Sequence, residues 1–176
     1  MLQQSIAKLI RGDYKLLHIT FPKQSDKLME IESFMPDTDN SVILSGSFNP
    51  LHSGHRNLLL AAQKKSGLQN ICYEFSIKNA DKGQLSADDP QLLARIAQFL
   101  ECPSGAGLVI TNESLFINKA KLMPNCHFVI GYDTYVRILN PKYYGGKSEN
   151  LCKVLGEFKR NNTKFVVAGR LVGEKW

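Results

Sequence analysis

No stretch of the 176-residue sequence approaches the ~20 consecutive apolar residues that a membrane-spanning helix needs. The first residues, MLQQSIAKLIRGDY, also lack a long apolar run followed by a small-residue cleavage site, so we expect no secretory signal peptide. These two absences argue against an association with membranes. They favour a cytoplasmic location for the protein, with the nucleus as the alternative.

Metal-ligand spacing is absent as well. The four cysteines, Cys72, Cys102, Cys126 and Cys152, never occur in the C-x-x-C pattern that zinc sites use. We therefore predict no metal site built from protein ligands. Without a secretory signal, we interpret the cysteines as reduced thiols, most of them small buried side chains of the core.

The net charge is +6 at pH 7, but the lysines are spread along the chain without a block of five or more basic residues. An excess of positive charge attracts polyanions, and charge alone does not distinguish nucleic acid from nucleotide phosphates. No aromatic-rich RNA-binding signature is present, so we predict small phosphorylated molecules as partners, and not nucleic acid. No sequence feature indicates an oligomeric state.

Short apolar runs alternate with helical patterns along most of the chain. We predict strands at 42–46, 71–77, 107–111, 127–131 and 164–169, and helices at 55–65, 89–101 and 149–160. Asp89 and Pro90 suit the cap and the first position of the second helix, and Gly67 suits the end of the first. Strands and helices in this alternation form βαβ units, and continuously apolar strands are buried on both faces. The sequence therefore predicts an α/β protein with a Rossmann-like parallel sheet and helices on both faces.

The first 40 residues differ from the rest in pattern. They hold one apolar run, Tyr14–Thr20, and then a polar stretch that ends in PDTDN at position 40. We interpret residues 1–40 as an N-terminal extension or the end of a preceding module, and residues 41–176 as the core domain. In the alternative interpretation, Tyr14–Thr20 forms an edge strand of the same domain.

The most informative segment is Gly46–His55, GSFNPLHSGH, between the first predicted core strand and the helix after it. In an open α/β sheet, ligands bind beyond the carboxyl ends of the strands. Gly46 allows the backbone to approach a ligand closely, and the unpaired N–H groups of a helix start favour an anion. His52 and His55 flank Gly54 there and can donate hydrogen bonds to phosphate oxygens as charge develops in a transition state. The alternative is a glycine-proline turn with two incidental histidines.

This segment resembles the G-x-F-x-P-x-H-x-G-H signature of the nucleotidylyltransferase superfamily. All its fixed positions are met, by Gly46, Phe48, Pro50, His52, Gly54 and His55. The resemblance implies that the two histidines are catalytic. It also implies that the nucleotide contacts Gly46, Ser47, Phe48 and Gly54.

Three later segments resemble nicotinamide-mononucleotide adenylyltransferases, particularly the divergent eukaryotic-type members. Residues 79–86, NADKGQLS, resemble the substrate loop after the second strand, and residues 92–95, LLAR, resemble the arginine-bearing helix that follows it. Residues 128–133, FVIGYD, resemble the G-x-D segment, whose glycine and aspartate approach the adenosine. The resemblance thus adds four residues to the predicted nucleotide and acceptor contacts: Lys82, Arg95, Gly131 and Asp133.

The three charged residues of this set also have structural interpretations. Lys82 in a polar loop can be a solvated surface lysine, and Arg95 can form an ion pair with a nearby acid. Asp133 can be the N-cap of a helix over TYVRIL, instead of accepting hydrogen bonds from ribose hydroxyls.

The resemblance implies an enzyme that transfers AMP from ATP to a phosphomonoester, above all to nicotinamide mononucleotide, giving NAD and pyrophosphate. ATP is then a substrate, and Mg²⁺ neutralises its triphosphate. Cytidylyltransferases and pantetheine-phosphate adenylyltransferases use the same histidine motif and are the alternatives. The family also carries a second phosphate-binding motif, S-S-T-x-x-R, after the last core strand, and these 176 residues contain no such motif. A non-catalytic nucleotide-binding module is therefore a further alternative.

Overall fold

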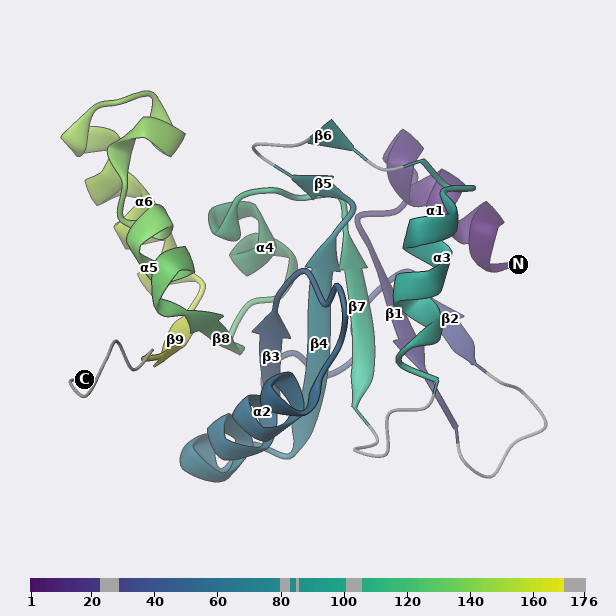
Figure 1. Cartoon of the computed structure of the whole chain (residues 1–176). Coiled ribbons are helices and arrows are strands. Elements are labelled where there is room, and N and C mark those ends of the chain that lie inside the picture. Colours follow the sequence, from purple (N-terminus) through teal and green to yellow (C-terminus); the bar gives the residue numbers. More distant parts are fainter. Residues whose placement is uncertain (23–28, 80–82, 85, 101–105, 170–176) are drawn as a thin grey trace.

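The computed structural model describes residues 1–22, 29–79, 83–84, 86–100 and 106–169 of the chain (Figure 1). The helices are α1 (Leu2–Arg11), α2 (Ser53–Ser66), α3 (Pro90–Ala97), α4 (Phe116–Leu122), α5 (Tyr132–Ile138) and α6 (Ser148–Arg160), with a 3-10 helix, η1, at Pro141–Tyr144. The strands are β1 (Leu16–Thr20), β2 (Glu30–Glu32), β3 (Ser41–Ser45), β4 (Asn70–Ser76), β5 (Lys78–Asn79), β6 (Gly83–Gln84), β7 (Gly107–Thr111), β8 (His127–Gly131) and β9 (Lys164–Ala168).

Within the described residues, seven strands form one sheet in the order β2-β1-β7-β4-β3-β8-β9, and β5 and β6 form a separate short ribbon. The strands β7, β4, β3, β8 and β9 run parallel to one another. β1 runs antiparallel to both of its neighbours, β7 and β2. The Rossmann-like α/β fold that the sequence predicts is confirmed. The sheet also carries two antiparallel strands at one side, which the sequence pattern does not predict.

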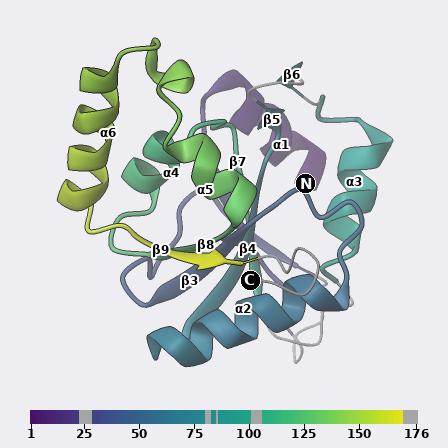
Figure 2. The ribbon, with the colours of Figure 1, turned by 60° about the vertical axis from the view of Figure 1, so that its left-hand side comes forward.

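Helices cover both faces of the sheet (Figure 1). Successive side chains of a strand point to opposite faces of the sheet. Each central strand therefore contributes side chains to two hydrophobic cores, one on each face. One core receives Ile6 from α1, Leu59 from α2 and Ile96 from α3. The opposite core receives Ile117 from α4 and Phe158 from α6. In Figure 2, β8 and β9 accordingly run between α2 on one side and α4, α5 and α6 on the other.

The predicted core strands agree with the structure to within one residue, and those at 107–111 and 127–131 coincide with β7 and β8. α2 ends at Gly67, whose φ of +73° is a left-handed conformation that glycine adopts readily. α3 begins as predicted, because Asp89 Oδ1 accepts a hydrogen bond from the N–H of Gln91 at 2.8 Å. It ends at Ala97 rather than at residue 101, because the N–H groups of Phe99 and Leu100 bond to carbonyls three residues back, which tightens the turn.

The N-terminal segment contributes to the same sheet. β1 pairs with β7 from Leu16↔Thr111 to Ile19↔Leu108, so the apolar run within Tyr14–Thr20 supplies a strand of this sheet. β1 is not the edge strand that the alternative interpretation expects, because β2 pairs with its other side. α1 lies outside the predicted elements and packs against the core that α2 and α3 also cover. It ends at Gly12, whose φ of +88° again suits glycine.

The structure also bears on membrane-spanning segments and on the state of the cysteines. Among the described residues, none of the helices combines the length and the apolar character that crossing a bilayer requires. The described cysteines are free thiols: Cys72 and Cys126 are buried, Cys152 is exposed, and Cys102 lies outside the described residues. Burial raises the pKa of the Cys72 and Cys126 thiols to about 12, which suppresses their reactivity.

Candidate functional site

The loop 46–52 leaves the carboxyl end of β3 and leads into α2 (Figure 1). Phe48 anchors it, because its ring is buried edge-to-face against Tyr73 and Phe99, with centroid distances of 5.3 Å and 5.6 Å. The backbone of Phe48 has a φ of +48°, which is uncommon for a residue other than glycine. A Cβ on Gly46 would lie 3.0 Å from the Phe48 ring, so the tight turn favours glycine at position 46.

Side chains of α3 and of the turn after it hold the same loop. Arg95 Nη2 donates a hydrogen bond to the carbonyl oxygen of Ser47 at 2.7 Å. Gln98 Nε2 donates to the carbonyl oxygen of Phe48 at 3.1 Å, and Gln98 Oε1 accepts from the N–H of Leu51 at 2.6 Å. These bonds satisfy backbone groups that no strand or helix pairs, and they fix the path of the loop.

Arg95 therefore lies at the predicted site, where it supports the loop. Its guanidinium carbon is 4.5 Å from the centroid of the Phe75 ring, a cation–π contact. Burial lowers the pKa of Arg95 and the nearby Asp89 raises it, but a guanidinium stays charged at any physiological pH. The residue thus places a positive charge beside loop 46–52.

His52 and His55 are brought together at the start of α2. Their rings stack with a centroid distance of 3.7 Å and an interplanar angle of 25°. The backbone N–H of His52 donates to His55 Nδ1 at 3.3 Å, and the Phe48 ring meets the His55 ring edge-to-face at 5.1 Å. Because Nδ1 accepts a hydrogen bond, neutral His55 carries its proton on Nε2, where it is a donor.

The environment of His55 favours its neutral form. Partial burial lowers the pKa of His55 below its ordinary value of 6.5, and the neighbouring His52 lowers it further. Near neutral pH, His55 is therefore an uncharged imidazole that donates from Nε2.

Two further predicted nucleotide contacts, Gly131 at the end of β8 and Asp133 in α5, follow a neighbouring strand of the sheet. β3 and β8 are parallel neighbours in which Leu44 is paired with Val129. Gly46 lies two residues after Leu44, and Gly131 lies two residues after Val129. Both glycines therefore lie at the carboxyl ends of their strands, at the same end of the sheet. Gly131 is the N-cap residue of α5, and Asp133 is exposed in the first turn. Asp133 is therefore not the cap of this helix.

Lys82 lies outside the described residues. Lys119 on α4 is buried and forms an ion pair with Glu74. Sequence reasoning missed Gln98 and Glu74. Gln98 gives no signal, because its partners are about 50 residues away along the chain. Glu74 gives a clear one, because it is the single acidic residue within the apolar strand ICYEFSI.

The arrangement suits an anionic ligand. The loop leads into the start of α2, and a helix start carries a partial positive charge. His52, Ser53 and Gly54 at this start are exposed, so a phosphate can reach them. Within the described residues, no group of three or more His, Cys, Asp or Glu side chains could hold a metal ion.

The histidines make stability depend on pH. Burial is the largest cause that lowers the pKa of His18, His55 and His127, so in the folded protein each binds a proton only below its ordinary pKa of 6.5. The unfolded chain binds more protons as the pH falls through 6.5, and folding stability must fall with it. We expect a lower free energy of unfolding at pH 5.5 than at pH 7.5 in urea titrations. Because burial dominates, 0.5 M salt should preserve the slope, and a flat or inverse dependence would contradict this account.

The chain is similar to a curated protein and, more weakly, to a solved structure. The chain is 27% identical over 143 residues to a Schizosaccharomyces pombe protein named "putative nicotinamide mononucleotide adenylyltransferase", across 77% of this chain and 56% of the relative. The chain thus spans about half the length of that curated relative. A solved protein of unknown function from Archaeoglobus fulgidus matches with a TM-score of 0.45 and 18% identity, over 74% of this chain and 99% of the other. No family model matches the sequence. With the curated relative added to the motif at Gly46–His55, the chain is a nucleotidylyltransferase-like protein, distantly related to the S. pombe protein.

Proposed function

We propose that the protein transfers the adenylyl group of ATP to nicotinamide mononucleotide, giving NAD and pyrophosphate. The observation that carries the proposal is the stacked His52–His55 pair at the exposed start of α2, beside the loop that leaves β3. The adenylyl donor and the acceptor in this proposal follow from the resemblance at residues 79–86 and 128–133 and from the name of the curated relative.

The proposed reaction needs positioning and charge stabilisation rather than covalent catalysis. A phosphate oxygen of the acceptor attacks the α-phosphorus of ATP in line, the new P–O–P bond forms, and pyrophosphate leaves with the electron pair of the broken bond. His55 Nε2–H is a donor suited to the charge that builds on the phosphate oxygens. Magnesium enters as part of the substrate, bound to the triphosphate.

The test is a substrate screen of the purified chain. ATP and CTP, each with magnesium, are offered against nicotinamide mononucleotide, pantetheine phosphate, phosphocholine and glycerol phosphate, and pyrophosphate release is measured. We expect release with ATP and nicotinamide mononucleotide, with NAD as the second product. CTP use without ATP use would replace the proposal with a cytidylyltransferase. Nucleotide binding by calorimetry without turnover would replace it with a binding module.

Gly54 offers a specific test of the histidine geometry. A Cβ at this position would lie 3.0 Å from Nδ1 and 3.1 Å from Cε1 of His52, so the imidazole must move by a few tenths of an ångström. We expect Gly54→Ala to keep the fold but to lower turnover by about tenfold, because small displacements of catalytic groups are costly.

The matched control is Gly156→Ala in α6, where a Cβ meets nothing within 4 Å. This substitution should leave turnover unchanged and stabilise the helix by about 0.5–1 kcal/mol. Equal turnover in both variants would show that the His52 ring position does not matter.

A further inference from the structure

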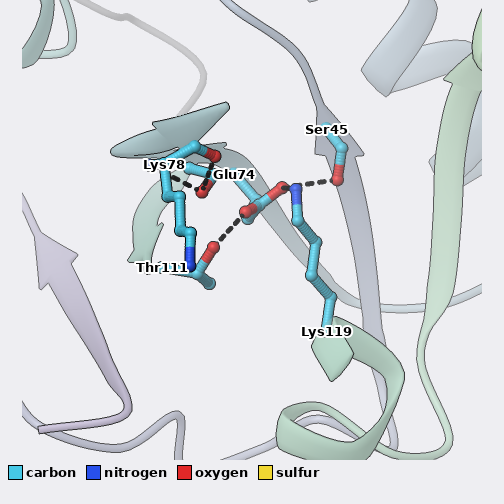
Figure 3. Close-up of polar contacts among 6 residues, drawn as sticks. Ser45, Glu74, Lys78, Thr111 and Lys119 are labelled. Atoms are coloured by element: carbon cyan, nitrogen blue, oxygen red, sulfur yellow. Dashed lines mark hydrogen bonds and ion pairs between the residues drawn. The ribbon is translucent and has the colours of Figure 1, made fainter. Parts of the chain in front are cut away.

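A buried ionic network includes Ser45, the residue that directly precedes loop 46–52 (Figure 3). The Glu74 side chain on β4 is fully buried, and its Oε2 accepts hydrogen bonds from Lys119 Nζ at 2.8 Å and from the Ser45 hydroxyl at 2.7 Å. Its Oε1 accepts from the Thr111 hydroxyl at 2.8 Å. One carboxylate therefore joins β3, β4, β7 and α4 on the sheet face that α4 covers.

Burying this ion pair carries a cost in free energy, so a role other than stability is a reasonable explanation for it. Removing two charges from water costs free energy that their attraction repays only with good geometry, and apolar side chains often stabilise such a position equally well. The three donors to Glu74 satisfy the carboxylate, so the network is ordered rather than a defect. Such a network defines the positions of the groups that it joins.

The network connects directly to the candidate site. Ser45 is the last residue of β3, and its hydroxyl binds the Glu74 carboxylate. The N–H of the next residue, Gly46, donates to the carbonyl oxygen of Glu74 at 3.0 Å. Both the side chain and the backbone of Glu74 thus hold the point where the loop begins.

Packing contacts connect the start of the loop, at Gly46, to His55. The space where a Gly46 Cβ would lie is closed by the Phe48 ring, and Phe48 contacts His55 edge-to-face at 5.1 Å. A change in the direction in which the chain leaves Ser45 would therefore move Phe48 and, with it, His55. Thr111 binds the same carboxylate but ends β7, so no such path runs from it to His55.

We propose that Glu74 is a positioning residue of the candidate site: through Ser45 it sets the direction of loop 46–52 and hence the placement of His55. The proposal rests on the proposed function for its effect on turnover. Its structural part, the coupling from Glu74 through Ser45 to the imidazole, stands apart from any particular substrate.

The experiment compares two variants that each remove one hydroxyl donor to Glu74. Ser45→Ala breaks the link to the loop but leaves Lys119 on Oε2, whereas Thr111→Val removes the donor to Oε1 and leaves the loop contact in place. Each variant loses one hydrogen bond to a buried carboxylate, so we expect each to lower Tm by about 2–4 °C. The loss in Thr111→Val should be at least as large as the loss in Ser45→Ala. Ser45→Thr keeps a hydroxyl and serves as the rescue variant.

Two readouts are taken on all three variants. The imidazole ¹⁵N resonances of His52 and His55 are followed by NMR, and turnover and KM for ATP are measured with nicotinamide mononucleotide. We expect Ser45→Ala to shift the His55 resonances and to lower kcat about fivefold or more, with KM within about twofold. Thr111→Val and Ser45→Thr should resemble the wild type in both readouts.

Equal effects of Ser45→Ala and Thr111→Val, or unchanged His55 resonances in Ser45→Ala, would overturn the proposal and reduce the network to a role in stability. If the wild type shows no turnover, the proposed function fails, but the NMR comparison still decides whether Glu74 and Ser45 position His55.

Discussion

Replacing His55 with alanine is expected to lower turnover of ATP and nicotinamide mononucleotide by on the order of a hundredfold or more, while nucleotide affinity changes much less. The loss of one donor aimed at developing charge typically has this size. A contact that strengthens in the transition state affects rate more than ground-state binding, so kcat falls and the dissociation constant does not follow. Steady-state kinetics and calorimetry on the same preparation check the two halves of this expectation.

His127 provides the matched control. It is also a partly buried histidine with a lowered pKa, but it begins β8, at the opposite end of that strand from Gly131. His127→Ala should therefore keep turnover near the wild-type value. Near-normal turnover in His55→Ala, or a nucleotidyl group trapped covalently on His52 or His55, would contradict the role of these histidines as hydrogen-bond donors.

Local patterns predicted most of the central sheet. The apolar run at 107–111 is followed by polar residues, and the run at 127–131 ends at Gly131. These signals are local in the sequence, so both strands could be predicted from it. The early end of α3 depends on tight hydrogen bonds at Phe99 and Leu100, which no helix-propensity pattern encodes. The antiparallel direction of β1 likewise depends on tertiary pairing with β7, far along the chain.

In the candidate site, too, residues in a contiguous motif could be predicted, whereas residues that meet through tertiary contacts could not. The histidine motif is contiguous, so the sequence located His52 and His55, and the structure shows them stacked. The support of the loop by Gln98 is not contiguous and could not be predicted. Glu74 could be recognised as a buried charge in an apolar strand, but its partner Lys119 depends on how α4 packs on the sheet.

Breaking the Glu74–Lys119 pair on one side is expected to destabilise the fold strongly. The side chains of Glu74 and Lys119 are 0% and 7% exposed, so either residue left alone is a buried charge without its counter-ion. Glu74→Gln and Lys119→Met should each lower the free energy of unfolding by about 3–5 kcal/mol, a large part of the total stability of a domain this size. Urea denaturation followed by circular dichroism measures this loss.

The double variant Glu74→Gln/Lys119→Met separates charge imbalance from packing. Glutamine keeps the shape and an acceptor oxygen for the hydroxyl of Ser45 or Thr111, and methionine fills the volume of the lysine stem. Because no charge is then left unpaired, we expect the double variant to be more stable than either single variant, with a loss of about 1–2 kcal/mol. Additive losses would show instead that the two charges contribute independently, and that the ion pair is not the unit that the buried network stabilises.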